Sequence, residues 1–190
     1  VRAPADENEM SRMMVTMCGY GEGPVAMRFP RASAAGVPAV DADKPLKAGE
    51  GRIMRNGSDA ALISIGSMLG PAIEASRLLE GSGLDVAVAD ARFLKPIDRG
   101  LICELSSDGR RIFTLEENST RGGFGDAVMD CLSSMNIRPN VTKLGIADGF
   151  VPHGGREELL EEQGLTAQAI AGTVLDVIHS GSKAGHGGAA

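Results

Sequence analysis

The chain has few aromatic residues and no excess of positive charge. Its 190 residues include no Trp, one Tyr and five Phe, and the formal net charge is −6. Base-stacking surfaces depend on exposed aromatic rings, and nucleic-acid binding depends on clustered Lys and Arg. We therefore expect no nucleic-acid partner, and 43% hydrophobic residues are enough for one good core.

Cysteine is also scarce, and long apolar runs are absent. Cys18, Cys103 and Cys131 are odd in number, far apart and without C-x-x-C spacing, so neither a disulfide framework nor a zinc site is indicated. No apolar segment approaches the roughly 18 residues that span a bilayer, and the N-terminus lacks the pattern of a signal peptide. We expect a cytoplasmic protein with no membrane partner.

The two ends of the chain differ from its middle. Asp6 followed by Glu9 has the form of a capping box and predicts a helix over about 6–17, and a chain that starts so close to a helix is expected to enter partway through a larger protein. The small, polar and aperiodic sequence "SGSKAGHGGAA" predicts a disordered tail over 180–190.

Strand-like and helix-like segments alternate in between. "PVAMRFPR" predicts a short strand that Pro30 must stop, and residues 32–48, rich in Ala, Gly, Pro and Asp, predict a linker. The later strand candidates are "DAALISI", "LDVAVAD", "RRIFTLE" and "NVTKLGI". The helices between and after them are expected at about 68–80, after Pro96, at about 123–135, after Gly155 and after Thr166. This alternation predicts an α/β fold with a mostly parallel sheet and helices on both faces.

One dipeptide predicts an exception to the parallel order. Asn56-Gly57 lies between the strand-like runs "GRIMR" and "DAALISIG". Asn-Gly supplies the positive φ angles of a two-residue hairpin turn. We therefore expect these two runs to pair as an antiparallel hairpin and to add one antiparallel strand to the sheet.

A glycine cluster lies between a strand and a helix, where some α/β folds bind phosphate. Gly122–Gly125 reads G-G-F-G, which is not the G-x-G-x-x-G spacing of a dinucleotide site. It also follows Glu116 and Glu117, whose charges repel a phosphate unless Arg121 compensates. We favour a structural role, in which the glycines allow close helix packing and positive φ.

Three other groups of residues favour structure over chemistry. The first group is Asp90, Arg92, Lys95 and Asp98. These residues either form a polar site at a strand end or, as we favour, form ion pairs and cap a helix that would begin at Pro96. The second has helical spacing and predicts core packing: Met10, Met13, Met14 and Met17. The third shares no metal-ligand spacing: His153, His179 and His186. Glu116 and Glu117 are adjacent in a strand and should point to opposite faces, so they are no ready-made acid–base pair.

Several motifs carry a resemblance to a known family. "MRFPR", "ALISIGSM", "DARFLKPID", "TLEENSTRGGFG" and "GIADGFVPHGGREELLEEQGL" occur in the order and spacing of the C-terminal part of the 1-deoxy-D-xylulose-5-phosphate synthase family, in the transketolase superfamily. The resemblance runs from "APADENE" to about His179. It implies that 1–31 end a pyrimidine-binding α/β domain, that 32–48 are the linker, and that 49–179 form a transketolase-type C-terminal domain.

The resemblance also implies an activity. Members condense pyruvate with glyceraldehyde 3-phosphate and release carbon dioxide, as homodimers that use thiamine diphosphate and Mg²⁺ in isoprenoid and thiamine precursor synthesis. The residues that bind the cofactor and the catalytic residues are expected in upstream domains, outside this chain. The isolated chain is therefore expected to be inactive, and those upstream domains to be its partners.

One active-site motif of the family falls within this chain. Its Tyr-Pro-Arg-Gly, whose arginine helps to bind the acceptor's phosphate, reads Phe29-Pro30-Arg31-Ala32 here. Arg31 is therefore the implied phosphate-binding residue, and its planar fork matches phosphate oxygens at the end of a strand. Arg28, two residues earlier on the same predicted strand face, is a weaker candidate.

Two alternatives stay open. A non-catalytic α/β assembly module would only complete another chain. The beta subunit of a 2-oxo acid dehydrogenase shares the alternation and the G-G-x-G turn, but it would transfer an acyl group to lipoyl and need no phosphate arginine. The combination of "ARFLKPID", "EENSTRGGFG" and "DGFVPHG" favours the synthase family.

Overall fold

Five strands form one sheet in the order β1-β3-β2-β4-β5. Their bounds are β1 (Arg52–Arg55), β2 (Ala60–Ser64), β3 (Val86–Asp90), β4 (Arg111–Ser119) and β5 (Val141–Ile146). In the computed structural model, which describes residues 1–184, β2 to β5 are parallel and β1 alone is antiparallel, paired with β3. The expected mostly parallel sheet with one antiparallel strand is confirmed.

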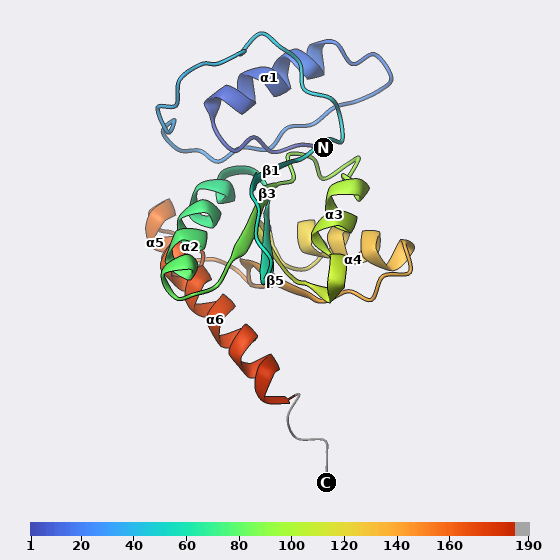
Figure 1. Ribbon diagram of the computed structural model, residues 1–190. Helices are drawn as coiled ribbons and strands as arrows, with labels where there is room; N and C mark the ends of the chain where they lie inside the picture. Colours follow the sequence, from blue (N-terminus) through green and yellow to red (C-terminus); the bar gives the residue numbers. More distant parts are fainter. Residues whose placement is uncertain (185–190) are drawn as a thin grey trace.

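Helices cover both faces of the sheet (Figure 1). Their bounds are α1 (Glu7–Cys18), α2 (Leu69–Gly81), α3 (Arg99–Leu105), α4 (Phe124–Ser134), α5 (Arg156–Glu162) and α6 (Ala167–Ala184), with 3₁₀ turns η1 (Gly66–Met68) and η2 (Ser107–Gly109). In β2, Ala60 and Leu62 pack with α2 and α6, whereas Ala61 and Ile63 pack with α3 and α4. Because side chains alternate along a strand and both faces are covered, the strand sequence is almost continuously apolar.

The predicted hairpin at Asn56-Gly57 is wrong. β3 lies between β1 and β2, and neither Asn56 nor Gly57 has a positive φ. A Cβ on Gly57 would stand 2.8 Å from the Cα of Val86. The glycine therefore lets the chain pass close to the backbone of β3, and the sequence before it pairs with β3 instead of β2.

The predicted strand over "PVAMRFPR" is also wrong. Within residues 1–184 its backbone forms only an isolated bridge, between Met27 and Arg2. Arg2 N–H donates to Ala26 and Arg28 N–H donates to Arg2, at 3.1 and 2.9 Å. A strand needs a neighbour along its length, and this segment has one only over these few residues, so Arg31 follows in a bend and not at a strand end.

The helix predicted near the N-terminus is confirmed, but only half of its capping box forms. The Asp6 side chain accepts the Glu9 N–H at 2.8 Å, whereas the Glu9 carboxylate binds Arg92. Of the four methionines, Met13 is fully buried with Leu46 and Phe93, as expected for core packing. Met14 is 49% exposed, so the expectation is wrong there.

The C-terminal helix is longer than the sequence predicts. α6 continues to Ala184, so the disordered tail expected from residue 180 is wrong over 180–184. Small residues such as Ala and Ser do not break a helix that is already nucleated and packed on the sheet. The rest of the predicted tail, including His186, lies outside the described residues. Within 1–184 no helix combines the length and apolar character that crossing a bilayer requires.

Candidate functional site

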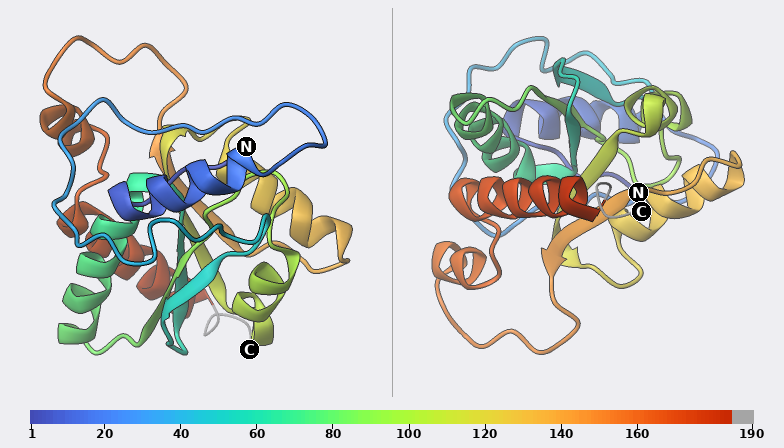
Figure 2. Two further views of the ribbon diagram at one scale, coloured as in Figure 1. Left: turned by 90° about the horizontal axis from the view of Figure 1, so that it is seen from above. Right: turned by 60° about the horizontal axis from the view of Figure 1, so that its bottom comes forward.

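The N-terminal segment lies across the edge of the sheet where the parallel strands end. Figure 1 and Figure 2 show α1 and the loops around it over this edge, next to the ends of β1 and β3. Ala3 N–H donates to the Arg92 carbonyl just beyond β3, at 3.0 Å. In α/β sheets, ligands bind beyond the carboxyl ends of the strands. A site between the N-terminal segment and the sheet is therefore in the usual place.

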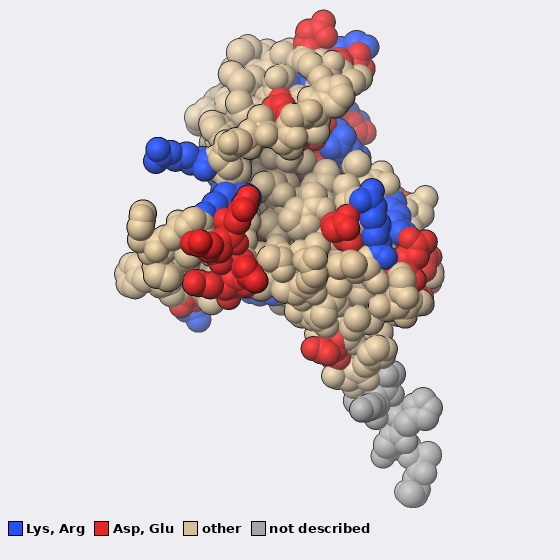
Figure 3. Space-filling view, turned by 90° about the vertical axis from the view of Figure 1, so that its left-hand side faces the viewer, with Lys and Arg blue, Asp and Glu red and all other residues tan. Residues whose placement is uncertain are grey.

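A cleft opens at this edge beside β4 and β5. Its inner part has a volume of about 320 Å³ and is lined by Arg31, Glu117 and Arg156 together with apolar side chains such as Ile146 and Leu159. Its outer part is bounded by the same two arginines. We call the whole the arginine cleft. Figure 3 shows a hollow between the upper and lower parts of the molecule, with basic side chains facing it from both.

Glu117, which lines the inner part of the arginine cleft, is hydrogen-bonded to residues from three other segments. Its carboxylate accepts hydrogen bonds from Arg156 Nε and Nη2, at 2.9 and 2.6 Å, and from the Ser67 hydroxyl at 2.6 Å. The Arg28 guanidinium donates to its backbone carbonyl. Burial raises the pKa of Glu117, but the hydrogen bonds from Arg156 and Ser67 outweigh burial and leave the pKa below its usual value.

Arg31 reaches this cleft with its guanidinium free. Within residues 1–184 it has no hydrogen-bond or ion-pair partner, whereas the weaker candidate Arg28 is engaged by Glu117. Ala32 does not have the positive φ that would strain it in place of the family's Gly. The sequence predicted Arg31 at the C-terminal end of a strand, which is wrong because no strand forms there, but the residue does lie at the ligand-binding edge. Its role as a phosphate ligand stays a prediction.

The glycine cluster does not cradle a phosphate. The backbone N–H groups of Phe124 and Gly125, at the start of α4, donate to the Glu116 carboxylate at 2.7 and 2.9 Å. Burial raises the pKa of Glu116, and these two hydrogen bonds partly offset that rise. Gly122 has φ 71°, and a Cβ on Gly125 would stand 2.6 Å from Lys143 Cγ. The structural interpretation is confirmed, because a carboxylate of the chain itself occupies the helix N-terminus.

The adjacent glutamates point to opposite faces, as predicted. Glu116 turns to α4, and Glu117 turns to η1 and α5. They therefore form no acid–base pair, and their opposite pKa shifts follow from their different partners.

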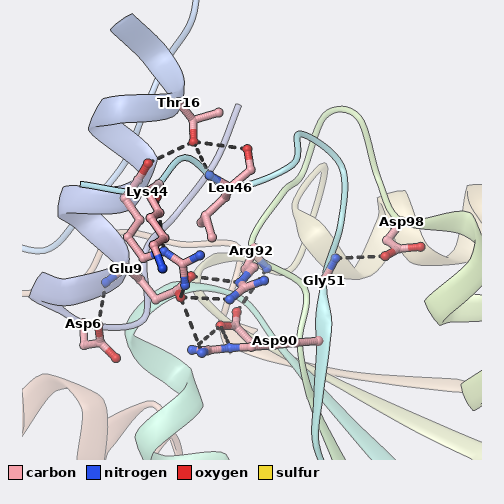
Figure 4. A network of polar contacts seen from close by, with 11 residues as sticks. Asp6, Glu9, Thr16, Lys44, Leu46, Gly51, Asp90, Arg92 and Asp98 are labelled. Atoms are coloured by element: carbon pink, nitrogen blue, oxygen red, sulfur yellow. Dashed lines mark hydrogen bonds and ion pairs between the residues drawn. The ribbon is translucent and has the colours of Figure 1, made fainter. Parts of the chain in front are cut away.

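The polar residues after β3 form a structural network (Figure 4). Arg92 Nε and Nη2 donate to the Glu9 carboxylate at 2.8 and 2.9 Å, and Arg52 bridges Glu9 and Asp90 at 3.4 and 3.1 Å. Burial raises the pKa of Asp90 to about 6, although Arg52 lowers it. This network fastens α1 to the sheet, which agrees with the structural interpretation.

The helix after β3 begins later than predicted. Asp98 is the N-cap of α3 and accepts the Leu101 N–H at 3.0 Å, so Pro96 lies before the helix and is not its first residue. Asp98 also accepts the Gly51 N–H at 2.8 Å, which ties the start of β1 to α3. Because the Asp98 side chain accepts hydrogen bonds from two backbone N–H groups, it fixes the start of α3 more firmly than Pro96 does.

The described residues do not fit a thiamine diphosphate–Mg²⁺ pair. Among residues 1–184 no group of three or more His, Cys, Asp or Glu could hold a metal ion. The N-terminus of α4, which follows the glycine turn, is occupied by the Glu116 carboxylate. We therefore assign no cofactor ligand to this chain.

Sequence reasoning did not single out Arg156 or Ser67. Ser67 lies in η1, directly after β2, and Arg156 is the first residue of α5, which follows β5 after a long loop. The available signal was that both β2 and β5 end at the ligand-binding edge of a parallel sheet, so polar residues shortly after them could meet Glu117.

The fold defines the class of the protein: it is an α/β domain with a mostly parallel sheet, one antiparallel edge strand and helices on both faces. A cleft lined by two arginines lies at the carboxyl edge of the sheet. The chain belongs to the transketolase C-terminal domain family, which matches residues 49–170.

The sequence similarity to two curated relatives extends over nearly the whole chain. It is 41% identical over 177 residues to the 1-deoxy-D-xylulose-5-phosphate synthase of Gloeobacter violaceus, which covers 93% of this chain and 28% of the relative. It is 42% identical over 171 residues to the synthase of Chlorobium phaeovibrioides, which covers 90% and 27%. The chain thus spans little more than a quarter of the length of these curated relatives.

Solved structures share the fold. A split-gene transketolase, solved as an inactive beta4 tetramer, has a TM-score of 0.81 and 33% identity, over 94% of this chain and 57% of that one. A transketolase from Pichia stipitis has a TM-score of 0.52 and 19% identity, over 72% and 20%. The second likeness concerns the fold alone.

Proposed function

We propose that this chain is the C-terminal part of a thiamine diphosphate-dependent 1-deoxy-D-xylulose-5-phosphate synthase. The complete enzyme condenses pyruvate with glyceraldehyde 3-phosphate and releases carbon dioxide. The observation that carries the proposal is 41% identity to a protein of that name over 93% of this chain. Residues 1–31 are proposed to end the pyrimidine-binding domain, 32–48 to be the linker and 49–179 to form the C-terminal domain.

Within that enzyme, Arg31 is the proposed ligand of the acceptor's phosphate. It lines the arginine cleft at the carboxyl edge of the sheet and has no partner among residues 1–184 that would hold it away from a ligand. A guanidinium offers two parallel donors to phosphate oxygens. Arg28 is proposed to act indirectly, because its guanidinium fixes the segment to Glu117.

The remaining equipment is proposed to come from elsewhere. Thiamine diphosphate and Mg²⁺ would supply the carbanion chemistry at pyruvate, held by residues outside this chain. The partners are the upstream domains and a second copy in a cytoplasmic homodimer. The chain by itself is expected to release no carbon dioxide from pyruvate.

A chimera tests the proposal. The corresponding C-terminal part of the Gloeobacter violaceus relative is replaced by this chain, and carbon dioxide release from pyruvate is measured with glyceraldehyde 3-phosphate present. We expect release by the chimera and none by the 190-residue chain. A folded, dimeric chimera without release, beside an active parent, would contradict the proposal and favour an assembly module. Acyl transfer to lipoamide by the chimera would favour the 2-oxo acid dehydrogenase alternative.

A further inference from the structure

We propose that Arg156 is a second specificity-determining residue of the arginine cleft and binds the acceptor's phosphate together with Arg31. The inference rests on the proposed function, because it concerns the same ligand. It goes beyond that function by assigning a residue from the far end of the C-terminal domain, 125 positions after Arg31 in the sequence.

The two arginines converge from separate parts of the chain. Arg31 comes from the segment that crosses the sheet edge, and Arg156 is the first residue of α5. Both line the inner and the outer part of the cleft. The side chain of Arg156 is 33% exposed, so it is held in place and still open to a ligand. A phosphate between them can accept from two guanidinium groups at once.

Glu117 presets the orientation of Arg156. Its carboxylate accepts from Nε and Nη2 of the guanidinium in a two-pronged contact, and the Ser67 hydroxyl donates to Oε2, the same oxygen that accepts from Nη2. The remaining nitrogen of Arg156, Nη1, has no hydrogen-bond partner among residues 1–184. A guanidinium held on one edge loses little rotamer freedom when it binds a ligand with the other.

The charges place the anion in the inner part of the cleft. There two arginines face one glutamate, Glu117, which leaves a formal charge of +1. In the outer part the same two arginines face Glu157 and Glu158, so the formal charge is zero. An anion is therefore favoured next to Glu117 and the apolar side chains of β5 and α5. Glu117 and Arg156 are partly buried there, which strengthens their electrostatic contacts.

The competing interpretation is that Arg156 only fastens α5 to β4. In that case its loss would lower stability and damage the use of every acceptor alike. A role in phosphate recognition instead separates phosphorylated from unphosphorylated acceptors. The two roles therefore predict different patterns of the Michaelis constant.

The experiment uses the complete enzyme that contains this chain. The variants are Arg156→Ala, Arg156→Lys, Arg31→Ala and, as a matched control on α2 outside the cleft, Arg77→Ala. The side chain of Arg77 is 67% exposed and, among residues 1–184, is paired only with Glu74. The Michaelis constants are measured for glyceraldehyde 3-phosphate, for glyceraldehyde and for pyruvate. Circular dichroism and dimer mass verify that each variant is folded.

We expect Arg156→Ala to raise the Michaelis constant for glyceraldehyde 3-phosphate about tenfold and to leave those for glyceraldehyde and pyruvate nearly unchanged, as expected for one charge-assisted contact. Arg156→Lys should recover part of the loss, since an ammonium keeps the charge but not the fork. Arg77→Ala should match the wild type.

Three results separate this inference from the proposed function. If Arg31→Ala selectively impairs the phosphorylated acceptor and Arg156→Ala does not, the inference is overturned and the proposed function stands. If Arg156→Ala impairs both acceptors equally, or if it does not fold and Arg156→Lys shows no selective effect, Arg156 is a structural clamp. No selective effect of either arginine would overturn the phosphate site itself.

Discussion

Replacement of Gly123 by Ala should destabilise the fold strongly, although it adds a single methyl group. Gly123 is the N-cap of α4 and lies under the turn that follows β4. A Cβ there would overlap the Ser119 carbonyl and the Glu116 carboxylate, and it would stand 2.7 Å from Glu116 Cδ. Neither neighbour is the far end of a flexible side chain on the surface, because Glu116 is 1% exposed and bonded to α4.

The size of the loss in the free energy of unfolding depends on whether the backbone or the Glu116 side chain moves to make room for the new Cβ. If the backbone shifts, the cost is that of overpacking a core, about 1 to 3 kcal/mol. If Glu116 moves instead, the buried carboxylate loses hydrogen bonds to Phe124 and Gly125, and one charge-assisted hydrogen bond is worth about 1.5 to 3 kcal/mol. Since the chain takes the cheaper route, Gly123→Ala should lower the free energy of unfolding by about 2 kcal/mol.

Urea unfolding of the purified chain, followed by circular dichroism, measures this change. Gly172→Ala is the matched control, because Gly172 lies within α6 and an added Cβ would have no atom within 4 Å apart from its chain neighbours and the backbone of the helix itself. That control should gain about 0.5 to 1 kcal/mol from helix propensity. An unchanged midpoint for Gly123→Ala would refute the close packing described above and would reopen the glycine turn as a phosphate site.

Two further predictions concern buried groups. The pKa of Asp90 is about 6 in the folded state against 3.8 when unfolded, so the folded state binds a proton at Asp90 more tightly than the unfolded state does. Protonation of Asp90 therefore raises the free energy of unfolding as pH falls from 6 towards 4. Relative to Asp90→Asn, the wild type should gain about 1 kcal/mol between pH 7 and pH 5 in urea unfolding, and an equal pH dependence of the two would contradict this. Cys18 and Cys103 are exposed, whereas Cys131 is buried with its thiol pKa raised by burial. A thiol reagent followed by mass spectrometry should therefore modify two cysteines in the native chain and the third only in urea; rapid modification of all three would show that α4 packs loosely.

The layers of the fold were predictable because burial leaves a direct mark on sequence. Strands covered on both faces must be apolar at nearly every position, as "VAVA" in β3 is, and the helices between them follow from length and periodicity. The order of pairing left no such mark. The residues of Asn56-Gly57 fit a hairpin, yet β1 pairs with β3, because pairing depends on the packing of the whole sheet.

The site was predictable only in part. Arg31 was found through a motif, and its place at the sheet edge follows from the fold. Ser67 in η1 and Arg156 at the start of α5 are 89 positions apart, and only the folded sheet brings them to Glu117. Similarly, the capping pattern of Glu9 did not predict its pairing with Arg92, because a local pattern cannot show that a distant arginine competes for the carboxylate.

The measurement that most directly tests the account compares two acceptors in the complete enzyme with and without Arg31. The ratio of kcat/KM for glyceraldehyde 3-phosphate to kcat/KM for glyceraldehyde reports recognition of the phosphate. Arg31→Ala should lower this ratio by about tenfold to a hundredfold, through the loss of charge-assisted hydrogen bonds worth about 1.5 to 3 kcal/mol. The Michaelis constant for pyruvate should stay close to that of the wild type. An unchanged ratio, with both acceptors impaired equally, would mean that Arg31 supports the fold and binds no phosphate.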